Sequence, residues 1–333
     1  MSGFERVAVA GAGAFGTALA LVAHRAGCPT TLWARDPRQA EQIGSTGENL
    51  AYLPAIAIPP GILVTADPAA LRAADLILLA APAQATRLLL AALASSGADG
   101  PVVVACAKGI ESATGRLQAE VIAECCPQAR AAALSGPGFA EEIARGLPTA
   151  LTIAAGELAL ARTIAAALSS DALRLYASDD MVGVELGGAL KNVLAIACGV
   201  VAGRGLGESA RAALIARGLA EMMRLGAAFG ARPETFMGLS GLGDLVLTAT
   251  SPKSRNTAFG MELGRGGSVA ELLRAGAPLA EGAHSAAIAD ELARRAGADA
   301  PITAAVAALV AGRIGVDEAI GGLVSRPLKA ENA

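Results

Sequence analysis

Lys191 stands in a setting that is unusual for a lysine. It lies in the run ELGGALKNVLAIACG (185–199), which is mostly apolar on both sides of it. The chain has only four lysines against 23 arginines, so its general need for positive charge is met by arginine. Arginine does not release its proton near neutral pH, whereas a lysine removed from water can. Lys191 is therefore a candidate for proton transfer; the alternative is a lysine that extends from a buried helix to solvent.

Small residues surround Lys191 if residues 180–202 form one helix. Gly187 and Gly188 then lie one turn before it and Ala195 one turn after it, on the same face. A glycine inside a helix costs about 1 kcal/mol relative to alanine, so this face indicates that something approaches closely. A packed helix and a bound ligand are both open interpretations.

Two further charged residues are candidates for the same site. Lys108 follows the apolar run VVVAC (102–106), which predicts a strand. Ligands of doubly wound sheets bind beyond the carboxyl ends of strands, although Lys108 could also mark an ordinary surface strand end. Asp244 lies between glycine-rich residues in GLGDL (241–245), where it either orients Lys191 or a substrate hydroxyl or is a simple turn residue.

The loop LSGPGFAEE (134–142) also leaves a predicted strand and enters a predicted helix. Gly136 and Gly138 lie in it, and its backbone N–H groups are free to meet a ligand. Glu141 and Glu142 would repel a phosphate there. We therefore expect the loop to line the nicotinamide or the uncharged part of a substrate.

The segment TSPKSRN (250–256) predicts the start of a helix. Ser251 is the expected N-cap and Pro252 the expected first helical residue. The first turn would then contain Ser254, Arg255 and Asn256. Helix amides, a guanidinium and a carboxamide can converge there on an anion; the alternative is an ordinary capped surface helix.

The order of the predicted elements indicates an α/β fold. Runs rich in Val, Ile and Leu alternate with amphipathic stretches such as Gln84–Ala94 and Glu157–Leu168, which is typical of a parallel sheet covered on both faces. The expected strands are Val7–Ala10, Thr30–Ala34, Leu76–Ala80, Val102–Cys106, Ala131–Leu134, Ala150–Ile153 and Leu173–Tyr176. Only helices are expected later, at 180–202, 207–230, 253–264, 281–296 and 301–310. The sequence thus predicts a doubly wound, mostly parallel sheet in residues 1–187, followed by an all-helical domain in residues 188–333.

The run GAGAFGTALA (11–20) directly follows the first expected strand and opens a helix. Gly11 permits a tight turn, Gly13 lets the backbone approach a pyrophosphate, and Gly16 lets helix and strand pack closely. Unpaired N–H groups at the helix start then meet the anion. The pattern predicts a dinucleotide site; a glycine-rich turn without a ligand is the alternative.

The end of the second strand bears on the choice of cofactor. Asp36 lies where a partner for the ribose 2′-hydroxyl is expected, and Arg35 before it could instead hold a 2′-phosphate. The two charges could also pair with each other. We favour NADP(H), with NAD(H) as the other candidate.

Charge and cysteine content exclude several classes of protein. The formal net charge is −3 without a basic cluster, which argues against nucleic-acid binding. Five cysteines without metal-ligand spacing and two histidines predict no metal site, and the thiols should be reduced and mostly buried. We expect no apolar run of the roughly 18–20 residues that a membrane helix needs. The N-terminus lacks the build of a signal peptide, so a cytoplasmic protein is expected, either a monomer or a homodimer.

Taken together, these segments resemble the bacterial NAD(P)-dependent glycerol-3-phosphate dehydrogenases. The matching pieces run in family order over nearly the whole chain: GAGAFGTALA (11–20), ENLAYLP (48–54), AKGIE (107–111), GPGFAEEIARGLPTA (136–150), VELGGALKNVLAIACGV (184–200), ARGLAEM (216–222), GLSGLGDLVLTAT (238–250) and SRN (254–256). The resemblance implies a Rossmann-type domain followed by a helical substrate domain. It also implies interconversion of dihydroxyacetone phosphate and sn-glycerol 3-phosphate, which supplies phospholipid synthesis, with a phosphorylated triose as substrate and no metal.

The resemblance also assigns roles to residues. Lys191 would be the acid/base, with Lys108 and Asp244 close to the reacting carbonyl. The implied substrate pocket contains Lys108, Gly136, Gly138, Lys191, Asn192, Asp244, Thr248, Ser254, Arg255 and Asn256. The cofactor-lining positions are Gly11, Gly13, Ala14, Phe15, Gly16, Arg35, Lys108, Ala140, Arg255, Leu279 and Glu281.

Two departures from the family pattern affect the substrate side. Gly138 and Ala83 stand where relatives usually carry a hydroxyl residue, so affinity is in question more than chemistry. One alternative enzyme is a β-hydroxyacid or 6-phosphogluconate type dehydrogenase, which the SRN and GLGD segments disfavour. A non-catalytic NADPH-binding protein is the alternative outside enzymes, and it does not explain two lysines and an arginine around one cleft.

Overall fold

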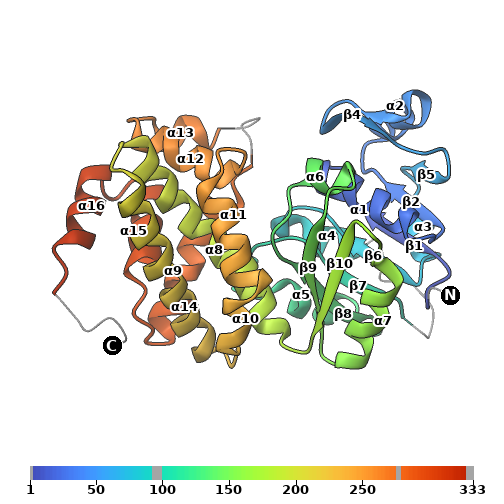
Figure 1. The fold of residues 1–333 in the computed structure, drawn as a ribbon. Coiled ribbons are helices and arrows are strands. Elements are labelled where there is room, and N and C mark those ends of the chain that lie inside the picture. Colours follow the sequence, from blue (N-terminus) through green and yellow to red (C-terminus); the bar gives the residue numbers. More distant parts are fainter. Residues whose placement is uncertain (1–2, 92–99, 275–278, 328–333) are drawn as a thin grey trace.

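The computed structural model describes residues 3–91, 100–274 and 279–327, and shows two lobes (Figure 1). All strands of the described residues lie before residue 179, and the following chain is helical. Figure 1 shows the sheet on one side in blue to green and the helical lobe on the other in yellow to red. The α/β fold class with a helical second part is therefore confirmed.

Eight strands of the described chain form one sheet in the order β10-β9-β8-β7-β6-β1-β2-β5. Neighbouring strands are parallel except β8 and β9, which are antiparallel. The strands are β1 (Val7–Ala10), β2 (Thr30–Trp33), β5 (Ile62–Thr65), β6 (Leu76–Leu79), β7 (Val102–Ala105), β8 (Arg130–Ser135), β9 (Thr149–Ala155) and β10 (Leu173–Ser178). Because the chain crosses from β5 on one side of β1 to β6 on the other, a crevice is expected beyond the carboxyl ends of β1 and β6.

All seven expected strands are present, together with three strands that were not expected. One is β5, at the edge of the sheet, and the others are β3 (Glu48–Asn49) and β4 (Leu53–Ala57), which form a separate hairpin. Figure 1 shows β4 and α2 projecting above the rest of the sheet lobe. The expected amphipathic stretch Gln84–Ala94 is helical as far as Ala91, and its last residues lie outside the described residues.

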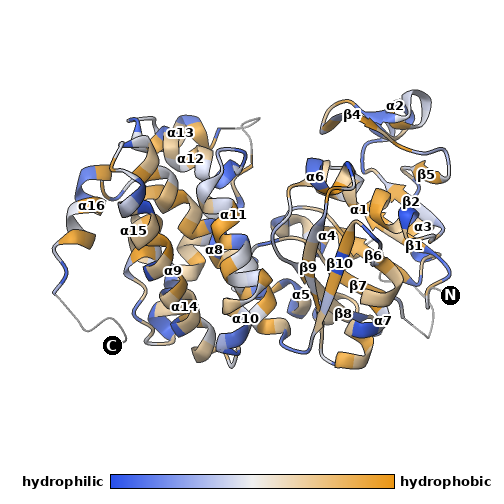
Figure 2. Ribbon diagram, in the orientation of Figure 1, coloured by the Kyte–Doolittle hydropathy of each residue, from blue (hydrophilic) through white to orange (hydrophobic). Residues whose placement is uncertain are grey.

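Alternate residues of each inner strand pack against helices on opposite faces of the sheet. Val7 and Val9 belong to one core cluster, and Ala8 and Ala10 belong to another. Hydrophobic colouring follows much of the sheet, while blue, hydrophilic residues mark outer surfaces such as that of α2 (Figure 2). The helices of this lobe are α1 (Ala14–Arg25), α2 (Pro37–Thr46), α3 (Ala69–Arg72), η1 (Ala83–Ala85), α4 (Thr86–Ala91), α5 (Gln118–Cys125), α6 (Ala140–Ala144) and α7 (Leu158–Leu168).

The helical lobe is built around α8 (Met181–Gly203). The first turns of α8 still contact the sheet, where Val184 packs with Ala133 and Ala154. The other elements are α9 (Glu208–Ala228), α10 (Pro233–Met237), the π-helical turn η2 (Leu239–Gly243), α11 (Asp244–Thr250), α12 (Arg255–Gly264), α13 (Val269–Leu272), α14 (Glu281–Arg295), α15 (Pro301–Val310) and α16 (Val316–Val324).

Helix α8 is long and apolar enough to cross a membrane by length and composition alone. The expectation that no segment would reach this length was therefore wrong, because Lys191 and Asn192 do not interrupt the helix. Most of the apolar stretch, 83%, is buried inside the protein, so α8 is a core helix of the helical lobe.

Helices α8 and α12 pack with their backbones in close contact. Gly199 and Gly203 on α8 face Gly260 and Gly264 on α12. A Cβ atom added at any of the four would lie under 3.0 Å from a backbone atom of the facing helix. The glycines therefore set the separation of the two helices, because no side chain can fit between them.

Candidate active site

Lys191 is buried in the middle of α8, with 7% of its side chain exposed. Its Nζ lies 3.0 Å from Oδ1 of Asp244 and donates a hydrogen bond to Oγ1 of Thr248. The Nζ of Lys108 lies 2.7 Å from the other carboxylate oxygen, Oδ2, of Asp244, and donates to the carbonyl oxygen of Gly136 at 2.7 Å. One carboxylate thus bridges two ammonium groups that come from different lobes.

The charges around this bridge act on Lys191 in opposite directions. Burial lowers the pKa of Lys191 to about 8, and the nearby charge of Lys108 adds to that effect. The carboxylate of Asp244 opposes it. Burial would raise the pKa of Asp244, but the two ammonium groups together bring it below the ordinary value. Lys191 can therefore exchange a proton near neutral pH, while Asp244 remains charged.

The two glycines before Lys191 allow η2 and the end of β8 to pack closely against α8. A Cβ on Gly187 would lie 2.6 Å from the carbonyl oxygen of Ser240 in η2. A Cβ on Gly188 would lie 2.6 Å from Oγ of Ser135 at the end of β8. Of the two interpretations of this face, close packing of the protein is the one that the structure supports.

Asp244 lies at the start of a helix, although a turn was expected at this position. Asp244 is the first residue of α11, directly after η2. Thr248 follows one turn later, so its hydroxyl faces the same side as the carboxylate. The Gly-flanked turn expected here is thus the π-to-α junction, which places Asp244, only 1% exposed, against Lys191.

The start of α12 differs from the prediction by three residues. Ser254 is the N-cap, with its Oγ accepting a hydrogen bond from the N–H of Thr257, so Ser251 is not the cap. The expected cap was wrong because residues 251–254 form a turn before the helix, in which the N–H of Ser254 donates to the carbonyl oxygen of Ser251 at 3.1 Å. Arg255, exposed, and Asn256 nevertheless occupy the first turn, as expected.

A chain of hydrogen bonds connects the start of α12 to Lys108. Asn192 donates from Nδ2 to the carbonyl oxygen of Lys108 at 3.1 Å. Asn256 donates to Oδ1 of Asn192 at 2.8 Å and accepts from the N–H of Gly282 at 3.0 Å. Asn192 and Asn256 therefore hold the backbone around the two candidate lysines.

The glycine-rich turn after β1 has the shape of a dinucleotide site. Gly11 has φ +121°, and the N-cap of α1, Gly13, has open space where a Cβ would point. A Cβ on Gly16 would overlap the carbonyl oxygen of Gly11, so Gly16 is needed for close packing. No side chain caps α1, so its first N–H groups are free to bind a pyrophosphate. These residues fit NAD(P).

Asn49 supports this turn, although the sequence analysis gave it no role. It is fully buried, and its Nδ2 donates to the carbonyl oxygen of Ala12 at 2.9 Å and to Oγ1 of Thr17 at 2.8 Å. Gln39 donates to the same carbonyl at 2.7 Å. Asn49 lies in the segment ENLAYLP (48–54), but the Ala12 carbonyl that it binds is 37 residues away, so the local sequence did not indicate this contact.

Three more of the predicted cofactor positions lie beside this turn, and a fourth, Arg35, lies after the next strand, β2. Ala14, Phe15 and Ala140 are half-buried where α1 and α6 pack together. Arg35 is exposed just after β2, and its neighbour Asp36 caps α2 by accepting from the N–H of Arg38 at 3.0 Å. The 2′-hydroxyl role proposed for Asp36 therefore competes with its role as a cap.

The start of α14 connects the two regions. Glu281 accepts a hydrogen bond from the N–H of Ala83 at 3.2 Å, and burial raises the pKa of its carboxyl while Arg255 and Lys108 oppose the shift. Leu279 lies half-buried two residues before it. Glu281 thus faces positive charge from both lobes.

The space at Gly138 is taken by an apolar side chain. A Cβ there would lie 2.8 Å from Cδ1 of Ile143, so a hydroxyl residue would require Ile143 to move.

Of the five free cysteines, Cys125 is partly exposed and the other four are buried. No group of His, Cys, Asp and Glu suited to a metal ion occurs among the described residues.

Comparison with known proteins identifies the family. Residues 6–161 match the N-terminus, and residues 180–321 the C-terminus, of the NAD-dependent glycerol-3-phosphate dehydrogenases. Relatives from Mesorhizobium japonicum (54% identical, covering 98% of this chain and 94% of the relative) and Caulobacter vibrioides (52%, covering 98% and 99%) are both named glycerol-3-phosphate dehydrogenase, NAD(P)+. The crystal structure of glycerol-3-phosphate dehydrogenase from Coxiella burnetii has a TM-score of 0.91 at 36% identity, covering 97% and 99% of the two chains. The chain therefore belongs to the NAD(P)-dependent glycerol-3-phosphate dehydrogenase family.

Proposed function

We propose that this protein interconverts dihydroxyacetone phosphate and sn-glycerol 3-phosphate with NADPH or NADH. The observation that carries the proposal is the buried Lys191–Asp244–Lys108 bridge, because it places an amine of lowered pKa where two lobes meet. In the cytoplasm, the product would supply phospholipid synthesis. In this proposal residues 1–187 bind the cofactor and residues 188–333 provide most of the substrate pocket.

Proton transfer is the task of Lys191 in this mechanism. The bound nicotinamide supplies the hydride for reduction and accepts it for oxidation. In reduction, the ammonium of Lys191 gives its proton to the carbonyl oxygen, and in oxidation the neutral amine removes the hydroxyl proton. Lys108 stabilises the developing negative charge on the same oxygen, while Asp244 holds both nitrogens in place. The neighbouring Thr248 hydroxyl accepts a hydrogen bond from Lys191 and orients it.

Substrate binding is assigned to the loop after β8 and the start of α12. Arg255 and the free amides of α12 would bind the phosphate, with Asn256 and Ser254 beside them. Gly136 and Gly138 would contribute backbone contacts, and Asn192 would keep α8 and the Lys108 backbone together. A substrate panel of dihydroxyacetone phosphate, 6-phosphogluconate and β-hydroxyacids tests the assignment, since turnover of the first at the nicotinamide absorbance band is expected to exceed that of the others.

Replacement of Arg255 by alanine is expected to raise the KM for dihydroxyacetone phosphate by about 10–100-fold. The loss of a charged hydrogen bond worth about 1.5–3 kcal/mol gives this range. Steady-state kinetics with a saturating cofactor would measure it. Arg265→Ala is the matched control because Arg265 pairs with Glu262 at the opposite end of α12. An unchanged KM in Arg255→Ala would reject the phosphate assignment.

Replacement of Arg35 by alanine is expected to move cofactor preference from NADPH towards NADH. Arg35 is exposed at the end of β2, and its neighbour Asp36 is engaged as a helix cap, so its guanidinium is available to a 2′-phosphate. The kcat/KM for NADPH divided by the kcat/KM for NADH should fall by about tenfold or more. Equal losses with both cofactors would contradict a 2′-phosphate contact.

A further inference from the structure

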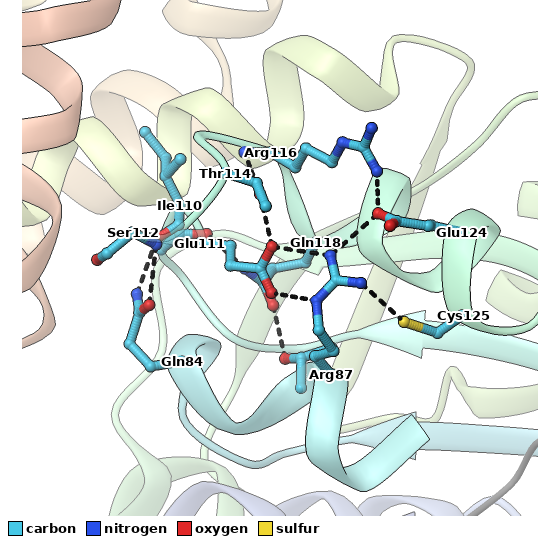
Figure 3. Close-up of polar contacts among 12 residues, drawn as sticks. Gln84, Arg87, Ile110, Glu111, Ser112, Thr114, Arg116, Gln118, Glu124 and Cys125 are labelled. Atoms are coloured by element: carbon cyan, nitrogen blue, oxygen red, sulfur yellow. Dashed lines mark hydrogen bonds and ion pairs between the residues drawn. The ribbon is translucent and has the colours of Figure 1, made fainter. Parts of the chain in front are cut away.

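The loop that carries Lys108 is held by side chains from a neighbouring helix. This Lys108 loop comprises residues 106–117 and connects β7 to α5. Gln84 in η1 donates from Nε2 to the carbonyl oxygen of Ile110 at 2.8 Å and accepts from the N–H of Ser112 at 2.9 Å. Figure 3 shows these two contacts side by side. The exposed side chain of Gln84 thus restrains the loop backbone at two points, one carbonyl group and one N–H group.

A second set of contacts comes from Arg87 on α4. Its Nε and Nη2 donate to the two carboxylate oxygens of Glu111, each at 2.9 Å (Figure 3). Glu111 is 6% exposed, also accepts from the Thr114 hydroxyl, and has its pKa lowered by Arg87. Planar two-point pairing of this kind fixes orientation as well as distance. The Arg87–Glu111 pair therefore restrains the middle of the loop.

The start of the loop has little space in which to move. Gly109 accepts a hydrogen bond from Gln118 at 3.1 Å, and a Cβ on Gly109 would lie 2.9 Å from Cβ of Ala83 and 3.4 Å from Oγ of Ser285. The backbone carbonyl of Lys108 accepts from Asn192. These contacts enclose the loop between η1 and α14, and they leave the Lys108 nitrogen directed at Asp244.

We propose that Arg87, Glu111 and Gln84 are positioning residues that hold the Lys108 ammonium in register with Asp244 and the reacting carbonyl. None of the three touches the candidate lysines, so they act through the loop backbone. Misplacement of a catalytic group by about 1 Å can lower a rate by about 100-fold, which makes such a restraint consequential. The inference rests on the proposed function, because Lys108 acts on the substrate there.

A double-mutant cycle tests whether the pair acts through Lys108. Glu111→Ala is expected to lower kcat for dihydroxyacetone phosphate reduction by about tenfold, while the Kd for NADPH measured by calorimetry changes by less than about twofold. In a Lys108→Ala background, the same replacement should change the remaining kcat by less than about twofold. Full additivity of the two effects, or an unchanged kcat in Glu111→Ala, would overturn the proposal.

Two further variants make the test specific. Gln84→Leu removes contacts to Ile110 and Ser112 and should reproduce the loss of kcat, so the test does not depend on the folding of one variant. Arg116→Ala is the matched control, because Arg116 lies on the same loop and its side chain pairs with Glu124, a partner that it shares with Arg87, rather than with the Glu111 carboxylate. It should keep wild-type kcat. Absence of turnover in the wild type would refute the proposed function instead, which separates the two failures.

Discussion

Lys191→Ala should lower kcat for dihydroxyacetone phosphate reduction by about 10²–10⁴-fold, the usual contribution of a positioned acid or base. The amine is buried, its pKa is lowered to about 8, and no other described group at this position combines those properties. Lys108 keeps its contacts to the Gly136 carbonyl and to the other oxygen of Asp244 in this variant, and in the proposed mechanism it stabilises charge rather than transferring the proton. Rates would be measured by absorbance of the nicotinamide under saturating substrate and cofactor.

Cofactor binding provides the control for this variant. The glycine-rich turn lies in the other lobe, so the Kd for NADPH should change by less than about twofold. Lys191→Met keeps most of the side-chain volume and should be as inactive as the alanine variant. Added methylamine should restore part of the activity of Lys191→Ala, because the vacated space can admit a small amine. Retention of more than about a tenth of the wild-type rate would reject the acid/base assignment.

Asp244→Asn is expected to affect both turnover and folding. The replacement leaves two ammonium groups near each other without their shared negative charge. Breaking a buried ion pair typically lowers the free energy of unfolding by about 3–5 kcal/mol. The pKa of Lys191 should fall further below about 8, because Asp244 is the main group that opposes the effect of burial. At neutral pH less of the protonated acid would remain, so the reduction rate should fall.

The pH dependence of stability distinguishes this effect from simple loss of packing. Lys191 has a lower pKa in the folded protein than its ordinary 10.5, so the unfolded chain binds more protons and stability rises with pH between about 8 and 10.5. In Asp244→Asn this window should extend below pH 8. Thermal unfolding from about pH 6 to 9 should show a deficit in Tm that shrinks as pH rises. A deficit independent of pH would contradict the electrostatic explanation.

Local sequence patterns were sufficient for the buried parts of the sheet. Runs such as LILL in β6 and VVVA in β7 are apolar throughout because both faces of the strand are covered. β5 has the composition of a strand, ILVT, and the same length as β1, β2, β6 and β7. It was not expected because Pro59, Pro60 and Gly61 directly before it indicate a loop.

The sequence indicated which residues belong to the candidate site, but it did not determine how they contact each other. Lys191 was identified from its apolar surroundings, yet its pairing with Asp244 depends on an unusual π-helical turn before α11. The N-cap of α12 was misplaced because a serine followed by proline and a serine three residues later both fit the start of a helix. Such choices depend on tertiary contacts between segments distant in the chain. They could not be made from local spacing.

The glycine contact between α8 and α12 has a consequence for substrate size, because it fixes the separation of two helices that carry proposed substrate-binding residues. Lys191 lies on one of these helices and Arg255 on the other, so the distance between the proposed proton donor and the proposed phosphate-binding residue depends on the place where the two main chains touch. This spacing depends on a contact between two helix backbones and not on the conformation of a loop. Replacing Gly199 or Gly260 by alanine would place a Cβ against a backbone oxygen of the facing helix, so it would force the two helices apart and change this spacing.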